Sequence, residues 1–198
     1  MRAYYDRRAR EYDDWWLGTG LFADRERPGW HAEIEALVAT IAALAPALTV
    51  DVACGTGFLT RHLPGEVVGL DQSENMLAVA QEQVPAAQFV QGDALALPFP
   101  NDSFERVFAS YFYCHLEQDD RQQFLTEARR VAPELVVVAS RWDEDQPRER
   151  REERILNDGS RWEVFKRVFG PEQLADELGG GDVLFAGRWF VAVRSAGT

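Results

Sequence analysis

The chain has 198 residues, of which 46% are hydrophobic and 12% aromatic, so it is long enough for one domain with a substantial core. Its formal net charge of −12 disfavours nucleic acid and anionic membranes as partners, because the summed field repels phosphate groups. The only cysteines, Cys54 and Cys114, have no metal-ligand neighbour at a useful spacing, and no apolar run suits a signal peptide or a membrane span. We therefore expect a soluble cytoplasmic protein with reduced thiols and no metal.

The N-terminal part of the chain is a polar and aromatic leader that ends in an amphipathic helix. Apolar residues recur at helical spacing over 31–44, before Pro46. From Leu48 onward, short β-rich runs alternate with helical ones, which is typical of parallel strands joined by crossover helices. The predicted strands are 48–52, 67–71, 88–91, 106–110 and 135–140, with helices that begin near Gly57, Ser73 and Gln118.

The last third of the chain begins with a segment that is dense in charge. Residues 143–165 predict a solvated connection, with or without a helical part. A short helix is predicted between Pro171 and Gly179. Two final strands, 182–186 and 189–194, predict a hairpin through Gly187 and Arg188.

A glycine-rich turn follows the first predicted strand, in the stretch "VDVACGTGFLT" that begins at Val50. Gly55 and Gly57 let the backbone approach a ligand closely, at the strand ends where parallel sheets bind small molecules. A dinucleotide fingerprint would have a third small residue where Thr60 stands, and Asp51 beside the loop disfavours an anionic pyrophosphate. A carboxylate at this strand end suits a ligand that carries a cationic amine.

Two further acids follow the next two strands. Asp71, at the end of the second strand, can accept both hydroxyls of a ribose. Asp93, in a turn after the third strand, can accept a hydrogen bond from an exocyclic amine such as that of adenine. Amine, ribose and adenine in this order describe S-adenosylmethionine.

These residues resemble the class I S-adenosylmethionine-dependent methyltransferases of the small-molecule type. The resemblance spans about residues 48–140 and rests on "VDVACGTG", "VVGLDQSENML", "QGDALALPFPNDSFERVFAS" and "YCHLEQDDRQQFLTEARRVAP", while the leader "YYDRRAREYDDW" is similar to that of many members. It implies an α/β, single Rossmann-like three-layer domain with helices on both faces of a seven-stranded, mostly parallel sheet of order 3-2-1-4-5-7-6, the last strand being antiparallel. Within the single domain 1–198 we expect a leader and partial lid (1–45), a cofactor-binding core (46–142) and a C-terminal part (143–198).

The resemblance also implies roles for individual residues in binding S-adenosyl-L-methionine. Asp51 lies close to the methionine amine, Asp71 holds the ribose, and Asp93 with the backbone of Ala94 binds adenine. The expected cofactor-binding residues are Asp51, Ala53, Gly55, Gly57, Asp71, Gln72, Met76, Asp93, Ala94, Ser110 and, from the leader, Tyr12. Ala53 replaces the first glycine of the family's pattern, a variation that we expect to cost little.

The candidates for a catalytic base follow the fourth strand, in "SYFYCHLE". His115 can titrate near neutrality, and Tyr111 is the second candidate, ahead of Tyr113. The alternative for His115 is a structural role at the start of the next helix, and Tyr111 can equally belong to the core. The acids Glu117, Asp119 and Asp120 are assigned to the positive end of that helix rather than to a metal site.

The predicted function is transfer of a methyl group from S-adenosylmethionine to an O, N or C atom of a small-molecule acceptor, by in-line displacement. A nicotinamide-dependent oxidoreductase is the alternative that Thr60 and Asp51 disfavour. A methyltransferase acting on RNA or protein and a non-catalytic cofactor-binding relative are further alternatives. The acceptor and the oligomeric state stay open. A narrow polar cavity would indicate an amine or acid acceptor, and an aromatic slot a quinone-like one.

Overall fold

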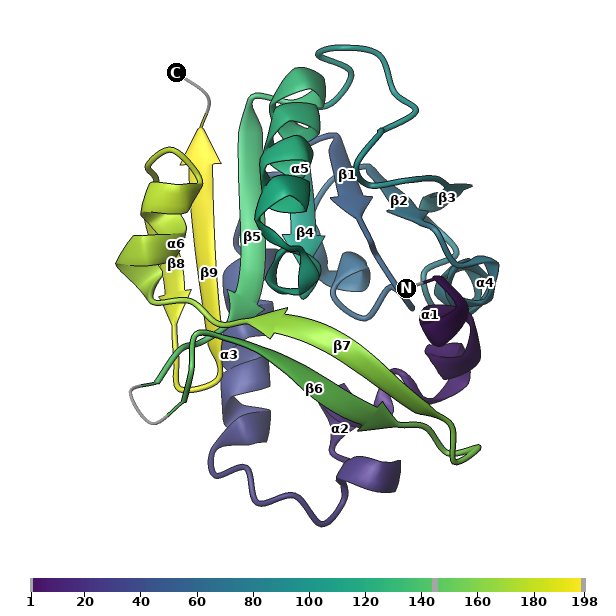
Figure 1. Ribbon diagram of the computed structural model, residues 1–198. Coiled ribbons are helices and arrows are strands. Elements are labelled where there is room, and N and C mark those ends of the chain that lie inside the picture. The colour runs from purple at the N-terminus through teal and green to yellow at the C-terminus, as the bar shows by residue number, and fades with distance from the viewer. Residues whose placement is uncertain (1, 144–145, 197–198) are drawn as a thin grey trace.

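A seven-stranded sheet forms the centre of the molecule in the computed structural model, which describes residues 2–143 and 146–196 (Figure 1). Its strands are β1 (Thr49–Val52), β2 (Val67–Asp71), β3 (Gln88–Gln91), β4 (Arg106–Ser110), β5 (Glu134–Ser140), β8 (Asp182–Ala186) and β9 (Phe190–Ala196). They run in the order β3-β2-β1-β4-β5-β9-β8, and β9 is antiparallel to both of its neighbours. Counted within this sheet alone, the order is the predicted 3-2-1-4-5-7-6, and the prediction of the Rossmann-like fold is confirmed.

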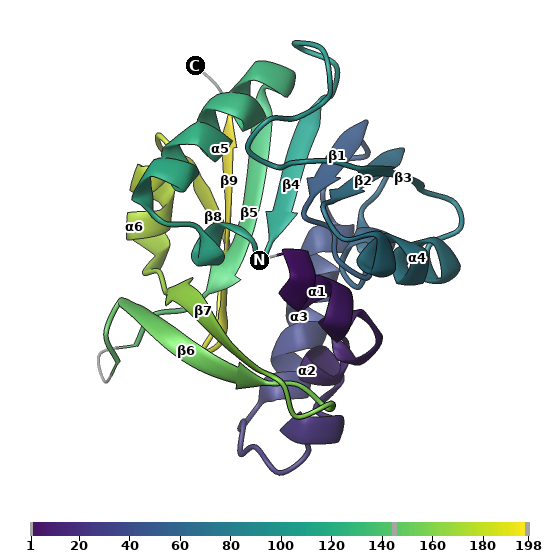
Figure 2. The same cartoon turned by 45° about the vertical axis from the view of Figure 1, so that its right-hand side comes forward.

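Helices cover both faces of the sheet and the edge at which its strands end. The helices are α1 (Arg2–Arg8), α2 (Asp14–Leu17), α3 (Trp30–Ala42), α4 (Glu74–Gln83), α5 (Gln118–Val131) and α6 (Pro171–Glu177). In Figures 1 and 2, α5 lies in front of the sheet and α3 behind it. The start of α4 is fixed by Ser73, whose Oγ accepts a hydrogen bond from the backbone N–H of Met76 at 3.2 Å.

The core follows from the composition of the central strands. Residues Val107–Ala109 of β4 and Leu135–Ala139 of β5 are almost wholly buried, as expected for parallel strands covered on both faces. Asp51 pairs with Gly69 on one side and with Phe108 on the other, so an acid stands in the middle of the sheet. The carboxyl ends of β1, β2 and β4 therefore meet at one edge.

The helix expected near Gly57 is absent, and this prediction was wrong. Between β1 and β2 the described chain forms only a short 3-10 helix, Thr60–His62. Pro64 and Gly65 follow at once, and Gly65 adopts a φ of 98° against the backbone of Ala47. This tight return leaves no length for a regular helix.

The expectation of a solvated connection over 143–165 was also wrong, because most of this segment is a separate β-hairpin. Its strands are β6 (Glu149–Ile155) and β7 (Arg161–Arg167), paired antiparallel, whereas residues 144–145 lie outside the described residues. One face of the hairpin packs on the leader, where Tyr4, Leu156 and Val164 form a small buried cluster. The other face is exposed, so charged residues hide the strand period in the sequence.

The hairpin and the leader meet across the carboxyl edge of the sheet (Figures 1 and 2). The rings of Tyr4 and Trp162 lie 5.8 Å apart, and Glu11 accepts a hydrogen bond from the backbone N–H of Asn157 at 2.9 Å. Farther along the leader, Trp16 is 3% exposed, and its carbonyl accepts a hydrogen bond from the indole N–H of Trp30 at 2.9 Å. These two segments together cover the edge at which the strands end.

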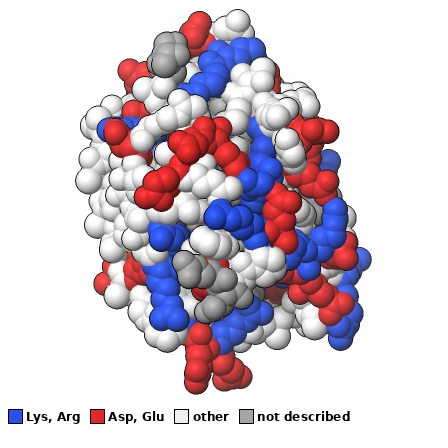
Figure 3. All heavy atoms as spheres, turned by 60° about the vertical axis from the view of Figure 1, so that its left-hand side comes forward, with Lys and Arg blue, Asp and Glu red and all other residues white. Residues whose placement is uncertain are grey.

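Acidic and basic side chains intermingle on the face of the molecule shown in Figure 3. Many of them form ion pairs, such as those that Arg167 makes with Glu149 and Glu177. Over the described ranges, none of the helices is both long and apolar enough to cross a bilayer.

Candidate cofactor site

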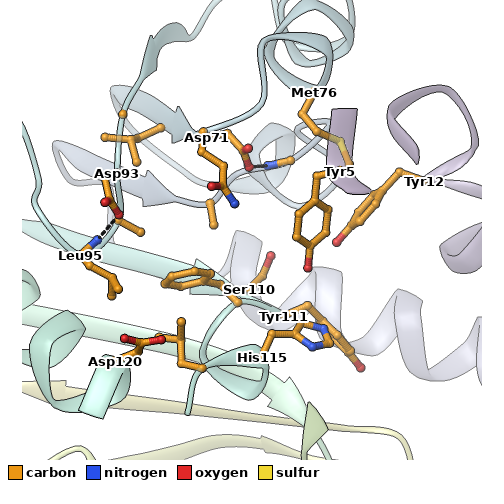
Figure 4. Close-up of a pocket in the computed structure, with 18 residues that line it drawn as sticks. Tyr5, Tyr12, Asp71, Met76, Asp93, Leu95, Ser110, Tyr111, His115 and Asp120 are labelled. Atoms are coloured by element: carbon orange, nitrogen blue, oxygen red, sulfur yellow. Dashed lines mark hydrogen bonds between the residues drawn. The ribbon is translucent and has the colours of Figure 1, made fainter. Parts of the chain in front are cut away.

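A cavity lies at the carboxyl edge of the sheet, under the leader (Figure 4). Most of the predicted site residues line it, namely Tyr12, Ala53, Gly55, Asp71, Gln72, Met76, Asp93, Ala94, Ser110, Tyr111 and His115. Asp51 and Gly57 do not line the cavity.

Asp51 lies buried beside the glycine turn, with 1% of its surface exposed. The hydroxyl of Thr60 donates a hydrogen bond to its Oδ2 at 2.6 Å, while Oδ1 is buried without a partner among the described residues. Burial raises the pKa of Asp51 to about 7, against the Thr60 hydrogen bond, which lowers it; the charge of Asp71 raises it further. A buried carboxylate oxygen without a partner is costly, so this site suits a ligand with a cationic donor.

The glycine turn adopts left-handed backbone at three positions, with φ of 58° at Ala53, 57° at Gly55 and 78° at Gly57. Tyr12 covers Gly55, because a Cβ on that glycine would lie 3.7 Å from the ring. Gly57 instead packs on α4, where a Cβ would lie 3.0 Å from Cγ2 of Val84. The expectation that Ala53 costs little does not fit its φ, since a left-handed alanine is unfavourable by about 1–2 kcal/mol.

Asp71 faces the cavity from the end of β2. Its Oδ2 accepts a hydrogen bond from the backbone N–H of Gly55 at 3.0 Å, and its Oδ1 accepts one from that of Ser73 at 2.9 Å. Burial raises the pKa of Asp71, and these backbone hydrogen bonds oppose the rise. The two amides fix the orientation of the carboxylate, and each oxygen keeps a second lone pair for a ligand.

Asp93 and Ala94 form a turn on the other side of the cavity (Figure 4). Oδ1 of Asp93 accepts a hydrogen bond from the backbone N–H of Leu95 at 2.9 Å. Met76, from the first turn of α4, is fully buried and contributes an apolar part of the wall. This end of the cavity therefore combines an acceptor with an apolar surface, as a purine ring requires.

His115 and Tyr111 lie at the opposite end, after β4. Nδ1 of His115 is 2.8 Å from the carbonyl oxygen of Phe165. A carbonyl oxygen can only accept a hydrogen bond, so Nδ1 carries the proton and Nε2 keeps its lone pair. Burial lowers the pKa of His115 to about 4, although that hydrogen bond opposes the fall. The imidazole is neutral at pH 7 and a weak base.

Tyr111 has a φ of 54°, which is strained for a bulky side chain. Its ring packs at 4.7 Å from that of Trp15 and 5.3 Å from that of Trp16. Burial raises the pKa of Tyr111 well above its ordinary value, so the phenol stays protonated. Tyr113 does not line the cavity, and its hydroxyl lies 3.4 Å from Oε2 of Glu177.

Several lining residues were not predicted: Tyr5, Leu70, Gly92, Leu95, Phe112, Leu116 and Asp120. The sequence assigns Asp120 to the helix dipole, although its place near His115 in the chain offers a signal. A second, smaller cavity shares Tyr5, Tyr12, Tyr111 and His115 with the first and adds Arg8, Trp15, Arg154 and Lys166. Among residues 2–143 and 146–196, no group of three or more acids, histidines or cysteines could hold a metal ion.

Comparisons with known proteins agree with this geometry. Residues 50–134 match the family described as a methyltransferase domain. The chain is 30% identical to the demethylmenaquinone methyltransferase of Thermotoga maritima over 132 residues, which are 64% of this chain and 54% of that protein. It is 42% identical over 94 residues to the enzyme of the same name from Shouchella clausii, covering 42% of this chain and 39% of that one. The chain thus spans about 39–54% of the length of these two relatives.

Likeness to a solved structure extends over nearly the whole chain. A complex of DhpI with SAH is 26% identical, with a TM-score of 0.69 over 98% of this chain and 94% of that one. The chain therefore has a Rossmann-like methyltransferase fold, and residues 50–134 are similar to a methyltransferase domain.

Proposed function

We propose that the protein binds S-adenosylmethionine in the large cavity and transfers its methyl group to an O, N or C atom of a small-molecule acceptor. The observation that carries the proposal is the unpartnered, buried Oδ1 of Asp51 beside a cavity that Asp71 and Asp93 line. The cofactor, when bound, supplies an electrophilic methyl group on a sulfonium.

Each of the three acids binds a different part of the cofactor. Asp51 pairs with the methionine amine, directly or through one water, and thereby gains the partner that it lacks among the described residues. Asp71, held by two backbone amides, accepts the ribose hydroxyls with its free lone pairs. Asp93 and the backbone of Ala94 bind the adenine amino group, while Met76 packs on the ring.

The other side of the site orients the acceptor and excludes water. Tyr5 and Tyr12 of the leader line one side of the cavity, and Ser110 lies at the end of β4 (Figure 4). Nε2 of neutral His115 accepts a hydrogen bond from the acceptor and positions it, and Tyr111 forms part of the aromatic wall. Alignment and a dry cavity are the main requirements of methyl transfer, so a weakly basic histidine suffices.

Calorimetric titration tests the proposal. S-adenosylhomocysteine should bind at micromolar concentration, and reduced nicotinamide dinucleotide should give no heat. Asp71→Asn, which keeps the shape of the side chain but weakens its acceptor strength, should reduce the affinity about 10–100-fold, whereas Asp102→Asn, on a distant loop, should leave it unchanged. Absence of binding by the parent protein at millimolar ligand would contradict the proposal.

A further inference from the structure

The smaller cavity is lined by cations and lies against the acceptor side of the cofactor site. Arg8 reaches it from the leader, and Arg154 and Lys166 reach it from the β6–β7 hairpin. It shares walls with the large cavity at Tyr111 and His115. Any group held there lies next to whatever fills the cofactor site.

The strand register explains why these cations point inward. Arg154 is directly opposite Trp162 on the hairpin, and Lys166 lies four residues beyond Trp162 on the same face. That face packs on the leader through Val164 and Tyr4. Arg154 and Lys166 are therefore carried under the leader, whereas Arg151 belongs to the opposite face and is exposed.

These inner cations have fewer partners than the outer ones. The side-chain ammonium of Lys166 has no hydrogen bond or ion pair with any described residue, and Nε of Arg154 is buried without a partner within the described ranges. Arg154 pairs through Nη2 with Glu152, which also binds Arg150. Arg8 donates a hydrogen bond to the Tyr4 hydroxyl at 2.7 Å and stacks on Tyr12, and no described carboxylate pairs with it.

The contrast with the outer surface is informative. There, cations and carboxylates stand side by side (Figure 3), and Arg151 pairs with Glu117 and Glu163. Of the three cations that line the small cavity, only Arg154 has an ion pair within the described ranges, with Glu152, although the whole chain carries a net charge of −12. Partly buried cations without counter-charges are unfavourable unless a ligand supplies them.

We propose that Arg8, Arg154 and Lys166 form the subsite for an oxyanion group, a carboxylate or phosphate-type group, on the acceptor of the methyltransferase. This inference rests on the proposed function, because the shared walls put the anion beside the cofactor site. The guanidinium of Arg154 donates through its free Nε–H, and Lys166 supplies a point charge. Nε2 of His115 accepts from any hydroxyl next to the anion. A neutral, apolar acceptor would leave Arg8 and Lys166 without a counter-charge among the described residues.

Binding of small anions tests the subsite without any turnover. Benzoate, acetate and inorganic phosphate are titrated against the protein, with and without S-adenosylhomocysteine, and the neutral amides benzamide and acetamide serve as matched controls. Ligand-observed NMR gives each affinity. We expect at least one anion to bind about 10-fold or more tightly than its neutral counterpart, and the comparison of benzoate with phosphate distinguishes carboxylate from phosphate-type acceptors.

Variants then locate the bound anion. Lys166→Met and Arg154→Met keep the apolar stems and should each weaken anion binding about 10-fold, while Lys166→Arg should retain most of it. Arg151→Met, on the exposed face of the same hairpin, is the matched control and should change nothing. Unchanged affinity for S-adenosylhomocysteine and a melting temperature no lower than that of the parent show that the variants fold.

Two results would overturn the subsite: amides that bind as well as the anions, or anion affinity that survives both methionine variants. A protein that binds anions in this way but no S-adenosylhomocysteine would contradict the proposed function instead. The two failures are therefore distinguishable.

Discussion

At neutral pH the buried carboxylate of Asp51 lowers the stability of the folded protein, and in the proposed function it raises the affinity for the cofactor. Asp51→Asn tests both effects. Burial raises the pKa of Asp51 to about 7 in the cofactor-free protein. The folded chain therefore holds a proton on Asp51 between about pH 4 and pH 7 that the unfolded chain has already lost. This stabilisation is complete at low pH and disappears as the pH rises through 7.

The magnitude follows from the size of the pKa shift. A rise from the usual 3.8 to about 7 corresponds to roughly 4 kcal/mol. The asparagine side chain carries no charge at any of these pH values, so its contribution to stability does not change with pH. The free energy of unfolding of Asp51→Asn should therefore exceed that of the parent by a margin that grows by roughly 3 kcal/mol between pH 5 and pH 8. Urea unfolding of both proteins across this range measures the difference.

The affinity of the parent protein for the cofactor should increase as the pH rises, whereas its stability decreases. Only the ionised carboxylate pairs with the methionine amine, so the dissociation constant of the parent should rise about 10-fold between pH 8 and pH 6. Asp51→Asn should bind about 30-fold or more weakly at pH 8 and lose this pH dependence. As a control, Thr60→Val removes the hydrogen bond that lowers the pKa of Asp51, so the pH dependence should move to higher pH. Equal affinity of the parent and Asp51→Asn at pH 8 would refute the reasoning.

Three further substitutions test the framework of the site. Ala53→Gly should raise the free energy of unfolding by about 0.5–1 kcal/mol, because relief of the left-handed strain exceeds the entropy lost by a glycine. A lower free energy of unfolding than the parent's, measured with urea, would show that Ala53 is not strained. Trp16→Ala should cost about 3–5 kcal/mol, measured in the same assay, since the ring is buried and stacks at 4.7 Å on Phe58; a cost under about 1 kcal/mol would show that it is not a core residue. Asp13→Ala removes the acceptor for the Thr56 hydroxyl at 2.5 Å and for the side chain of Gln83 at 2.8 Å. Limited proteolysis should therefore cut the leader faster than in the parent. An unchanged rate would show that these two hydrogen bonds do not hold the leader in place.

Most of the sheet could be predicted because buried parallel strands have a simple signature. The runs at Val67–Asp71 and Arg106–Ser110 are bounded by turns and have the predicted limits in the structure. Ser73 indicates the start of α4 through its capping hydroxyl. Where the local signal is strong and the tertiary context agrees with it, the sequence suffices.

The errors arose where tertiary packing overrides the local pattern. The glycine turn predicts a helix by analogy with other ligand-binding sheets, but Pro64 and Gly65 force an early return to β2. In the hairpin, charges occupy both faces of β6, so neither a strand period nor a core face is visible. Its inward face is defined only by contact with Tyr4, which is far away in the chain.

The residues of the candidate site likewise fall into those that the sequence places and those that only the tertiary structure brings there. Acids that end consecutive parallel strands, such as Asp71, can be placed together from chain order alone. Arg154 and Lys166 reach the site only because the hairpin folds back over the sheet edge, and no local motif marks them. The acids that end the strands, and Tyr111 and His115 after β4, were thus accessible to sequence reasoning, whereas the cations of the hairpin required the structure.

A crystal structure of the complex with S-adenosylhomocysteine tests the central claim most directly. It should show the methionine amine on Oδ1 of Asp51, directly or through one water, the ribose hydroxyls on Asp71 and the adenine amine beside Asp93. A ligand bound elsewhere, or bound in this cavity with Oδ1 of Asp51 still unpartnered, would contradict the account.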